Sequence, residues 1–539
     1  MPTGFFAVPE LLEHKAEQHK HSPFLFYRDS SISYEELNSM VTKAASGLLA
    51  EGVRKGDKVG ILSHNSIDYV ILEFAILKIG AVCVPLNRHF KGDLLAYVIN
   101  HSDLSSLFIE SQYVNNVKDV LPKLGVLTFV VREGEEARLP NAIVYESLVN
   151  RDVAGPLRVS ATYEDPAFIL YTSGTTGLPK GVIYEHYGIV PQNFETYSQA
   201  QLEAAGYSFG DVLYLPFPLY HVFGQVQLIG ALRNDCKVAL ADRFSASNFW
   251  HDVVKYKATV ILHQGVSIPI LLRQPPSDLD RQHNARISLG AGVPNERVWR
   301  EFEDRFGVKI LEYYASTEGA FFGCGTVPTN KVGTIGKAYG FAELRIVDEY
   351  GKDAGVNRPG RLLSRLKPEY SRKKPEQLYY KDPAAGLKRF THDGWFISGD
   401  IVYMDEEGYL HYVGREETRI RYRGENVSPE QVENIINMYP AVLESVVVGV
   451  YNEEFGDEDI KAFIVAKNTR EFDHVEFIRW CEQRMPYFMI PRYIELLDEP
   501  IRKNEDTGKP LRAYYKSIDL TDKTWDRLRS AVKLSRETS

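Results

Sequence analysis

Residues 171–181 form the part of the chain whose residue types are best suited to chemistry. They read Tyr-Thr-Ser-Gly-Thr-Thr-Gly-Leu-Pro-Lys-Gly. Gly174, Gly177 and Gly181 allow tight turns and a close approach of the backbone to a ligand, and exposed amides there can donate to phosphate oxygens. Lys180 adds a mobile positive charge. The run therefore predicts a polyphosphate-binding loop. Its four serine and threonine hydroxyls belong to Thr172, Ser173, Thr175 and Thr176.

The loop follows the apolar run 167–171, which reads as a buried strand. It would therefore leave the edge of a sheet, as phosphate loops commonly do. It is not a Walker loop, because that pattern needs four residues between its glycines and then Gly-Lys-Ser/Thr. Here two residues separate Gly174 from Gly177, and a proline precedes the lysine.

A second group of polar side chains follows the apolar stretch 308–311, which suits a strand that enters a loop. The hydroxyl of Thr317 could bond to an α-phosphate, and the carboxylate of Glu318 could hold magnesium, which prefers oxygen ligands. A helix-capping threonine beside a solvated glutamate is the plainer alternative. Segment 393–400 ends in Asp400, between a turn and a strand, and its two acceptor oxygens suit the vicinal diol of a ribose.

The elements that must position these side chains alternate between helix and strand. Apolar residues recur at helical spacing over 37–48, and a strand-like segment follows at 58–62. The same order appears at 69–79 followed by 81–85, and again from 249 to 263. This alternation predicts an α/β fold in which helices cover parallel sheets.

The strand-like segment 409–413 ends at a charged stretch, and a fresh helix-and-strand pattern begins at 429–464. We therefore expect two domains, 1–415 and 416–539. Segment 366–388 is polar, with clustered lysines, prolines and tyrosines, and we expect it to be an exposed excursion.

Composition excludes several classes of protein. With 539 residues the chain exceeds one ordinary core, and its formal charge of −9 offers no general attraction for nucleic acid. The four cysteines are widely spaced, so neither zinc nor a disulfide framework is indicated, and a reducing cytoplasm fits best. The longest apolar stretch, 70–86, is interrupted by Glu73, Lys78 and Pro85. It reads as a core helix followed by a strand, so no transmembrane segment is expected.

The run 171–181 resembles the signature of the adenylate-forming superfamily, which contains acyl-CoA synthetases, luciferases and the adenylation domains of peptide synthetases. Segment 485–491, Met-Pro-Tyr-Phe-Met-Ile-Pro, resembles another signature of this superfamily, and the matches keep its order from about residue 30 to 512. Segments 243–250, 314–319 and 424–428 look most like those of the crotonobetaine/carnitine and fatty-acid-transport branches. The resemblance implies a large N-terminal domain that binds ATP and the acyl group, with a small mobile α+β C-terminal domain.

The resemblance also implies roles for the polar side chains. Tyr314 would pack near adenine, Thr317 would touch phosphate, and Glu318 would ligate Mg²⁺ together with Thr172. The superfamily places its adenine pocket at the small residues 290–292 and an arginine, here Arg415, on the ribose. The expected ATP- and AMP-binding set is Thr172, Ser173, Gly174, Thr175, Thr176, Gly177, Lys180, Gly290, Ala291, Gly292, Tyr314, Thr317, Asp400 and Arg415.

Segment 500–509 resembles the C-terminal loop that delivers the superfamily's catalytic lysine. Lys509 stands directly after Thr-Gly, as the motif requires, and is favoured over Lys503. Attack on an α-phosphate accumulates negative charge, which a point cation stabilises selectively in the transition state. The expected catalytic residues are Lys509, Thr317 and Glu318.

Further roles follow from the resemblance alone. The hinge between the domains falls on Glu417, where Asp or Lys is more usual, and Gly424 lies in the loop beside the pantetheine tunnel. Segment 216–224 resembles the lining of the acyl pocket, which makes His221 a candidate gate, with Gly224 beside it. Without the resemblance, His221 would read as a core histidine among aromatic residues.

The activity implied is that of an ATP-dependent carboxylic acid–CoA ligase, with ATP, Mg²⁺ and coenzyme A as its cofactors and substrates. An acyl-adenylate forms first, and a thiol then attacks it while the small domain rotates at the hinge. Free coenzyme A is the favoured acceptor, because the chain contains no Gly-Gly-x-Ser-Leu carrier segment. A carrier-protein thiol, another acceptor, or a non-catalytic nucleotide-binding regulator are the alternatives. The acid stays open among short charged, fatty and bulky cyclic acids, and a homodimer is compatible with the sequence.

Overall fold

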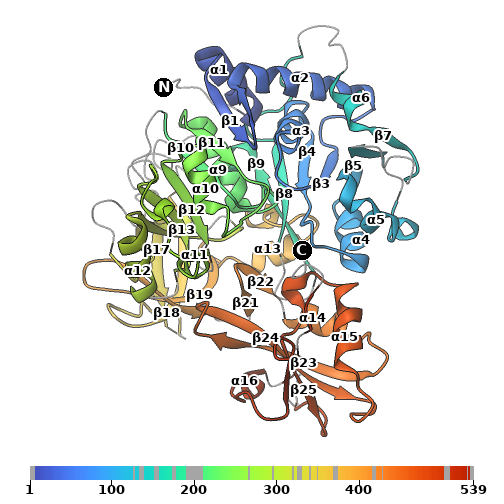
Figure 1. The fold of residues 1–539 in the computed structure, drawn as a ribbon, viewed down its shortest axis with the longest axis vertical. Coiled ribbons are helices and arrows are strands. Elements are labelled where there is room, and N and C mark those ends of the chain that lie inside the picture. Colours follow the sequence, from blue (N-terminus) through green and yellow to red (C-terminus); the bar gives the residue numbers. More distant parts are fainter. Residues whose placement is uncertain are drawn as a thin grey trace. The chain divides into compact units, whose positions relative to one another are not determined.

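The computed structural model divides the chain into two compact units, which are described separately (Figure 1). Unit 1 comprises residues 1–88, 98–171 and 181–414, and unit 2 comprises residues 89–97, 172–180 and 415–539. The structure describes residues 7–125, 128–132, 139–150, 157–172, 178–189, 210–264, 267–293, 296–318, 321–324, 331–338, 342–348, 350–367, 374–415, 420–427, 429–502, 510, 512–530 and 532–534.

Among the described residues, the first sheet of unit 1 has seven strands in the order β7-β6-β5-β3-β4-β8-β9. The pairs from β7 through β8 are parallel. The strands are β3 Lys58–Leu62, β4 Val82–Pro85, β5 Leu104–Glu110, β6 Thr128–Arg132, β7 Ala142–Val144, β8 Pro166–Thr172 and β9 Lys180–Glu185.

A second sheet of unit 1, within the described ranges, has nine strands in the order β16-β15-β14-β13-β12-β10-β11-β1-β2. Its middle strands are parallel, whereas β2, β15 and β16 run antiparallel to their neighbours. The strands are β1 Pro23–Tyr27, β2 Ser30–Ser33, β10 Val212–Leu215, β11 Lys237–Leu240, β12 Val260–Gln264, β13 Ile287–Ala291, β14 Lys309–Ala315, β15 Phe321–Cys324 and β16 Lys337–Ala338.

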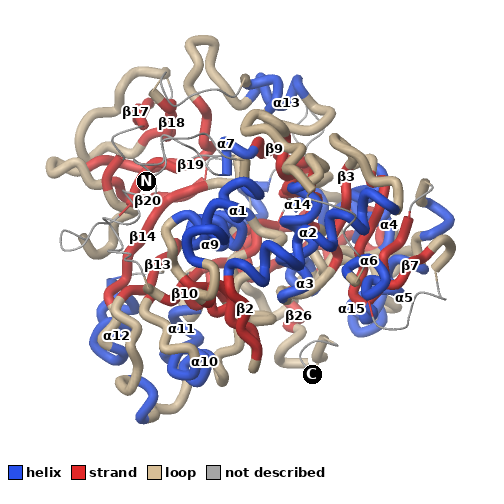
Figure 2. The backbone as a smooth tube through the Cα atoms, turned by 90° about the horizontal axis from the view of Figure 1, so that it is seen from above, coloured by secondary structure: helices blue, strands red, loops and turns tan. Residues whose placement is uncertain are grey.

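Helices of unit 1 pack against these sheets (Figure 2). Helix α2 begins with a capping box, in which the Ser33 side chain accepts from the Glu36 amide and the Glu36 carboxylate accepts from the Ser33 amide. Helix α3 is buried along most of its length, as its apolar sequence requires. One core cluster joins residues of both sheets to α1, α2, α3 and α9. The helices are α1 Val8–His19, α2 Tyr34–Ala50, α3 Ile67–Lys78, α5 Val114–Lys118, α6 Tyr145–Val149, α7 His186–Ile189, α9 Val222–Arg233, α10 Phe249–Lys255, α11 Ser267–Leu272, α12 Glu296–Phe306 and α13 Pro383–Lys388. Helix α4, Gly92–His101, includes residues of both units.

The last part of unit 1 is an antiparallel sheet in the order β17-β18-β19-β20. Its strands are β17 Ala342–Val347, β18 Gly360–Leu366, β19 Phe396–Met404 and β20 Leu410–Arg415. Unit 2 contains the hairpin of β21 and β22 and a sheet in the order β23-β24-β25-β26, against which α14 and α15 share a core. These elements are β21 Ile420–Tyr422, β22 Glu425–Val427, α14 Pro429–Ile436, β23 Val442–Asn452, β24 Asp457–Ala466, α15 His474–Glu482, β25 Tyr493–Leu497, α16 Arg512–Lys516 and β26 Thr524–Asp526.

The predicted α/β class is confirmed, and the strand expected at 58–62 is β3 with the same bounds. Unit 2 contains residues 89–97 and 172–180 together with the C-terminal residues. The predicted division of the chain into the domains 1–415 and 416–539 stays a prediction. None of the helices within the described ranges combines the length and apolar character that crossing a bilayer requires.

One local expectation was wrong, and two were right only in part. Strand β14 continues to Ala315 rather than ending before the motif, because Tyr313 to Ala315 pair with β15. Asp400 was expected between a turn and a strand, but it lies inside β19. The preceding Gly399 does not end the strand, because it lies at an irregularity within the β18–β19 pairing. In segment 366–388, most of the described residues are exposed or half-buried, as expected, but Leu378 and Tyr379 are buried, because a bridge joins Tyr379 to Val182 of β9.

Candidate active site

Two tyrosines hold the Thr317–Glu318 pair that follows β14. The hydroxyl of Tyr184 donates to the carbonyl oxygen of Thr317, and the hydroxyl of Tyr379 donates to Oε1 of Glu318 at 3.0 Å. Tyr184 belongs to β9, and the segment of Tyr379 pairs with β9 through the Ile183 amide, which donates to the Leu378 carbonyl at 3.1 Å. One strand therefore supplies or positions both contacts.

The hydroxyl of Tyr184 is a fixed donor. Burial raises its pKa, and the nearby charges of Glu318 and Glu185 raise it further. The phenol therefore stays protonated at physiological pH, and it is the donor to the Thr317 carbonyl, which has no hydrogen to give. Sequence patterns missed both tyrosines, because contacts between residues far apart in the chain, such as Tyr184 and Thr317 at a separation of 133 positions, leave no local signal.

A second pair of tyrosines surrounds Asp400. The hydroxyl of Tyr314 donates to Oδ2 of Asp400, and the hydroxyl of Tyr412 lies 3.5 Å from Oδ1. The Asp400 amide donates to Oγ of Ser398 at 3.0 Å, and Gly399 between them has a φ of +79°. Such an irregularity re-aims the side chain that follows it. The structure thus brings together two residues, Tyr314 and Asp400, that the sequence assigned separately to adenine and ribose.

The small residues 290–292 end β13 and begin the turn after it. A Cβ atom at Gly290 would lie 1.9 Å from the carbonyl oxygen of His263 on β12, so only glycine fits there. Gly292 has a φ of +87°. The buried carboxylate of Glu312 accepts from the Gly292 amide at 2.8 Å and from the Val293 amide at 2.6 Å. Glu312 therefore shapes the turn by accepting from the backbone amides of the turn.

Glu312 was missed by the sequence analysis. Its only local signal is a carboxylate within an apolar strand, between Leu311 and Tyr313. A buried carboxylate requires partners, and two backbone amides supply them. Because Glu312 and Tyr314 both belong to β14, one strand reaches the 290–292 turn and Asp400.

The predicted acyl segment packs beside the same strand. His221 is the residue before α9, and its ring lies 4.6 Å from that of Tyr220. A Cβ atom at Gly224 would lie 2.4 Å from the carbonyl oxygen of Pro218, so the segment folds tightly onto itself. The ring of Phe223 lies 5.6 Å from that of Tyr313. These contacts place the first turn of α9 against β14.

The remaining assigned residues are placed only in part. Thr172 ends β8 and Lys180 begins β9. Gly424 occupies the β21–β22 turn with a φ of +84°, and Arg415 is described only as the end of β20. Residues Ser173, Gly174, Thr175, Thr176, Gly177, Glu417 and Lys509 lie outside the described residues.

A divalent cation was expected at Glu318. Among the residues that the structure describes, no three His, Cys, Asp or Glu side chains gather as a metal site. Magnesium, however, is commonly bound by one or two carboxylates together with phosphate oxygens and waters. A half-buried carboxylate whose orientation is set by Tyr379 fits that kind of ligand set.

The residues around β14 include several that the sequence assigned to nucleotide binding, and comparisons with known proteins show the family of the chain. The family model for the AMP-binding enzyme matches residues 12–367, and the model for the AMP-binding enzyme C-terminal domain matches residues 431–509. The chain therefore belongs to the AMP-binding enzyme family, as its sequence motifs predicted.

Individual relatives are similar over most of their length. The crotonobetaine/carnitine–CoA ligase of Salmonella heidelberg (strain SL476) is 30% identical over 474 residues, which are 86% of this chain and 89% of that enzyme. The o-succinylbenzoate CoA synthetase of Bacillus subtilis has a TM-score of 0.81 at 23% identity and covers 95% of this chain and 99% of its own. The amide bond synthetase of Marinactinospora thermotolerans also has a TM-score of 0.81, at 21% identity, with the same coverage. These two structures share the fold.

Proposed function

We propose that this protein is an ATP-dependent carboxylic acid–CoA ligase. It forms an acyl-adenylate with release of pyrophosphate, and then an acyl-CoA thioester with release of AMP. The main support is the composition of β14 and its continuation, where Tyr314, Thr317 and Glu318 follow one another and Asp400 accepts from Tyr314. Membership of the AMP-binding enzyme family supports the adenylation step.

In this proposal the ribose hydroxyls donate to Asp400, the adenine lies at the 290–292 turn, and Glu318 ligates Mg²⁺ bound to the phosphates. The two carboxylates have different tasks, and each is oriented by a tyrosine hydroxyl. Fixed donors and acceptors of this kind favour the transition state because they need no rearrangement as charge develops. In this proposal the hydroxyl of Thr317 binds phosphate while its carbonyl is held by Tyr184.

The acyl group enters beside α9, where His221 and Gly224 lie. The proximity of Phe223 to Tyr313 supports this, because it brings the acyl segment to the strand that carries the nucleotide residues. A small-molecule carboxylic acid is the substrate class. The similarity to crotonobetaine/carnitine–CoA ligases makes short charged acids the first to test, followed by fatty and cyclic acids.

The test is carboxylate-dependent ATP–pyrophosphate exchange across a panel of acids. Lys509→Ala and Glu318→Ala should each lower the exchange rate by about 10²–10³-fold, because each removes a charge that stabilises the transition state. Lys503→Ala is the matched control for a lysine on the same segment, and it should exchange normally. If the wild type catalyses exchange with none of the acids, or if Lys509→Ala exchanges normally, the proposal is contradicted.

The second half-reaction needs its own measurement. Acyl transfer from the adenylate should proceed with free CoA, and parallel reactions with an amine acceptor test the alternative of another nucleophile. Glu417→Pro should slow thioester formation more than adenylation, because a proline restricts the backbone at the proposed hinge. Equal loss of both half-reactions in Glu417→Pro would remove the hinge role.

A further inference from the structure

The turn between β21 and β22 in unit 2 contains an arginine in an unfavourable backbone conformation. Arg423 and Gly424 are the two residues between the paired Tyr422 and Glu425, and their φ angles are +49° and +84°. Hairpin turns with two positive φ angles usually carry Asn-Gly or Asp-Gly, because a longer side chain disfavours the left-handed region. Such a conformation persists where the surroundings hold it, and it is often found at functional sites.

Two buried aspartates of β24 hold Arg423. Its amide donates to Oδ2 of Asp457 at 2.6 Å, and its Nη1 lies 2.5 Å from Oδ1 of the same residue. Its Nη2 donates to Oδ1 of Asp459 at 2.9 Å. The guanidinium also lies 3.7 Å from the ring centre of Phe455. Charge-assisted bonds to both the backbone and the side chain of one residue fix the turn.

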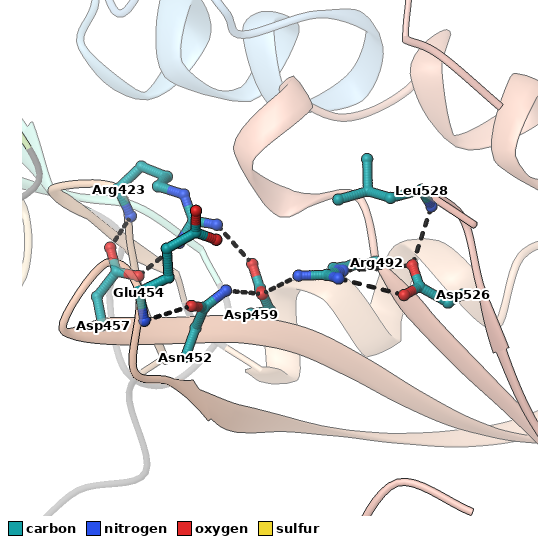
Figure 3. A network of polar contacts seen from close by, with 8 residues as sticks. All are labelled: Arg423, Asn452, Glu454, Asp457, Asp459, Arg492, Asp526 and Leu528. Carbon is teal, nitrogen blue, oxygen red and sulfur yellow. Dashed lines mark hydrogen bonds and ion pairs between the residues drawn. The ribbon is translucent and has the colours of Figure 1, made fainter. Parts of the chain in front are cut away.

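The network continues beyond the turn (Figure 3). Oδ2 of Asp459 accepts from Nδ2 of Asn452 at 2.6 Å and from Nη1 of Arg492 at 2.7 Å. Arg492 in turn pairs with Asp526 of β26 at 3.2 Å. The hairpin is therefore tied across the sheet of unit 2. Removal of Arg423 leaves two buried carboxylates with one fewer cation between them.

We propose that Arg423 is a positioning residue for the transfer of the acyl group to the thiol. By anchoring the turn to Asp457 and Asp459, it fixes the backbone of Gly424, whose missing side chain permits close approach by the thiol-bearing arm. This inference rests on the proposed function and on the sequence resemblance, which implies that Gly424 lies beside the pantetheine of CoA. Adenylation uses Lys509, on a different segment, and does not require this turn.

The experiment separates the two half-reactions in the full-length protein. Adenylation is followed by pyrophosphate exchange with the best acid of the panel. Thiol transfer is followed by mixing preformed acyl-adenylate with CoA and measuring acyl-CoA in a single turnover. Arg423→Gly suits the backbone angle of the turn but removes the guanidinium. It should slow thiol transfer about ten- to a hundredfold, as small misplacements do, and leave exchange within about twofold of wild type.

Two further variants identify the cause. Arg423→Lys keeps the charge but not the fork of donors, so it should recover part of the transfer rate. Arg470→Gly, an exposed arginine in the turn after β24, is the matched control and should transfer normally. If Arg423→Gly does not fold, Asp459→Asn replaces it, and a loss confined to thiol transfer is again expected.

A normal transfer rate in Arg423→Gly, or an equal loss in both half-reactions, overturns the inference. Failure of the wild type to catalyse exchange with any acid overturns the proposed function, and the inference falls with it. Normal exchange together with slow transfer in Arg423→Gly and partial recovery in Arg423→Lys supports it.

Discussion

The hydroxyl of Tyr379 lies 3.0 Å from Oε1 of Glu318, although 61 residues separate them in the chain. Tyr379 is itself held by its bridge to Val182 of β9. The orientation of the proposed magnesium ligand therefore depends on the pairing of a distant segment with β9.

Tyr379→Phe removes this hydrogen bond without changing the size of the ring. Because a bond to a charged acceptor is lost, we expect the concentration of Mg²⁺ needed for half-maximal pyrophosphate exchange to rise about five- to tenfold. Tyr380→Phe is the control, since the Tyr380 hydroxyl bonds to Asp103 instead. An unchanged magnesium requirement in Tyr379→Phe would show that Glu318 is oriented by other means.

Asp400→Asn tests the ribose contact. The amide keeps one acceptor oxygen, so ATP should still bind, with its KM raised about tenfold. In the wild type, 2′-deoxy-ATP should be a poorer substrate than ATP, and this preference should shrink in Asp400→Asn. Asp393→Asn, an exposed aspartate of the same sequence motif, serves as the control. If both proteins prefer ATP equally, Asp400 does not touch the 2′-hydroxyl.

Gly290→Ala tests the close packing under the proposed adenine turn. The new methyl group would lie 1.9 Å from the His263 carbonyl, so β12 and β13 must separate. We expect a cost of about 1–3 kcal/mol in the free energy of unfolding, as for other overpacked sites, and weaker nucleotide binding. Gly230→Ala is the counterpart on α9. Apart from the neighbouring backbone of α9 itself, nothing lies within 4 Å of its new methyl group, so Gly230→Ala should be neutral or stabilising by about 0.5–1 kcal/mol. Thermal unfolding with and without ATP measures both.

Glu73 predicts a pH dependence of stability. Burial raises the pKa of its carboxyl to about 8 from 4.5, although the hydrogen bond from Gln225 opposes this. A raised folded-state pKa means that the stabilising contribution is complete below pH 4.5 and is lost as the pH rises toward 8. Each pH unit in this window costs about 1.4 kcal/mol.

Glu73→Gln removes this titration while keeping an acceptor for Gln225. The unfolding temperature of the wild type should therefore fall relative to that of Glu73→Gln between pH 5 and 8. Glu17→Gln, an exposed position on α1, controls for the loss of one negative charge. A difference between wild type and Glu73→Gln that stays constant across this range would mean that Glu73 is ionised in the folded protein.

The sequence by itself determined the class of fold, the family and several of the regular elements. The strand 58–62 and the helix over 37–48 could be predicted because their signals are local, namely apolar spacing bounded by glycine and capping residues. Motifs such as 313–319 were recognisable for the same reason. Each motif lies in one short segment of the chain, so its order of residue types can be recognised without knowledge of the fold.

Only the tertiary structure decided which groups support those motifs. Four residues outside the recognised motifs contact the assigned residues through their side chains or backbone, namely Tyr184, Tyr379, Tyr412 and Glu312. The motif that each of them supports does not contain it. Arg423 reads as part of an exposed charged hairpin, yet it is bound to buried aspartates more than thirty residues later. The physical reason is that the spacing of apolar residues indicates only which face of its own helix or strand a residue occupies. Hydrogen bonds across sheets depend on strand order and register, which long-range pairing sets.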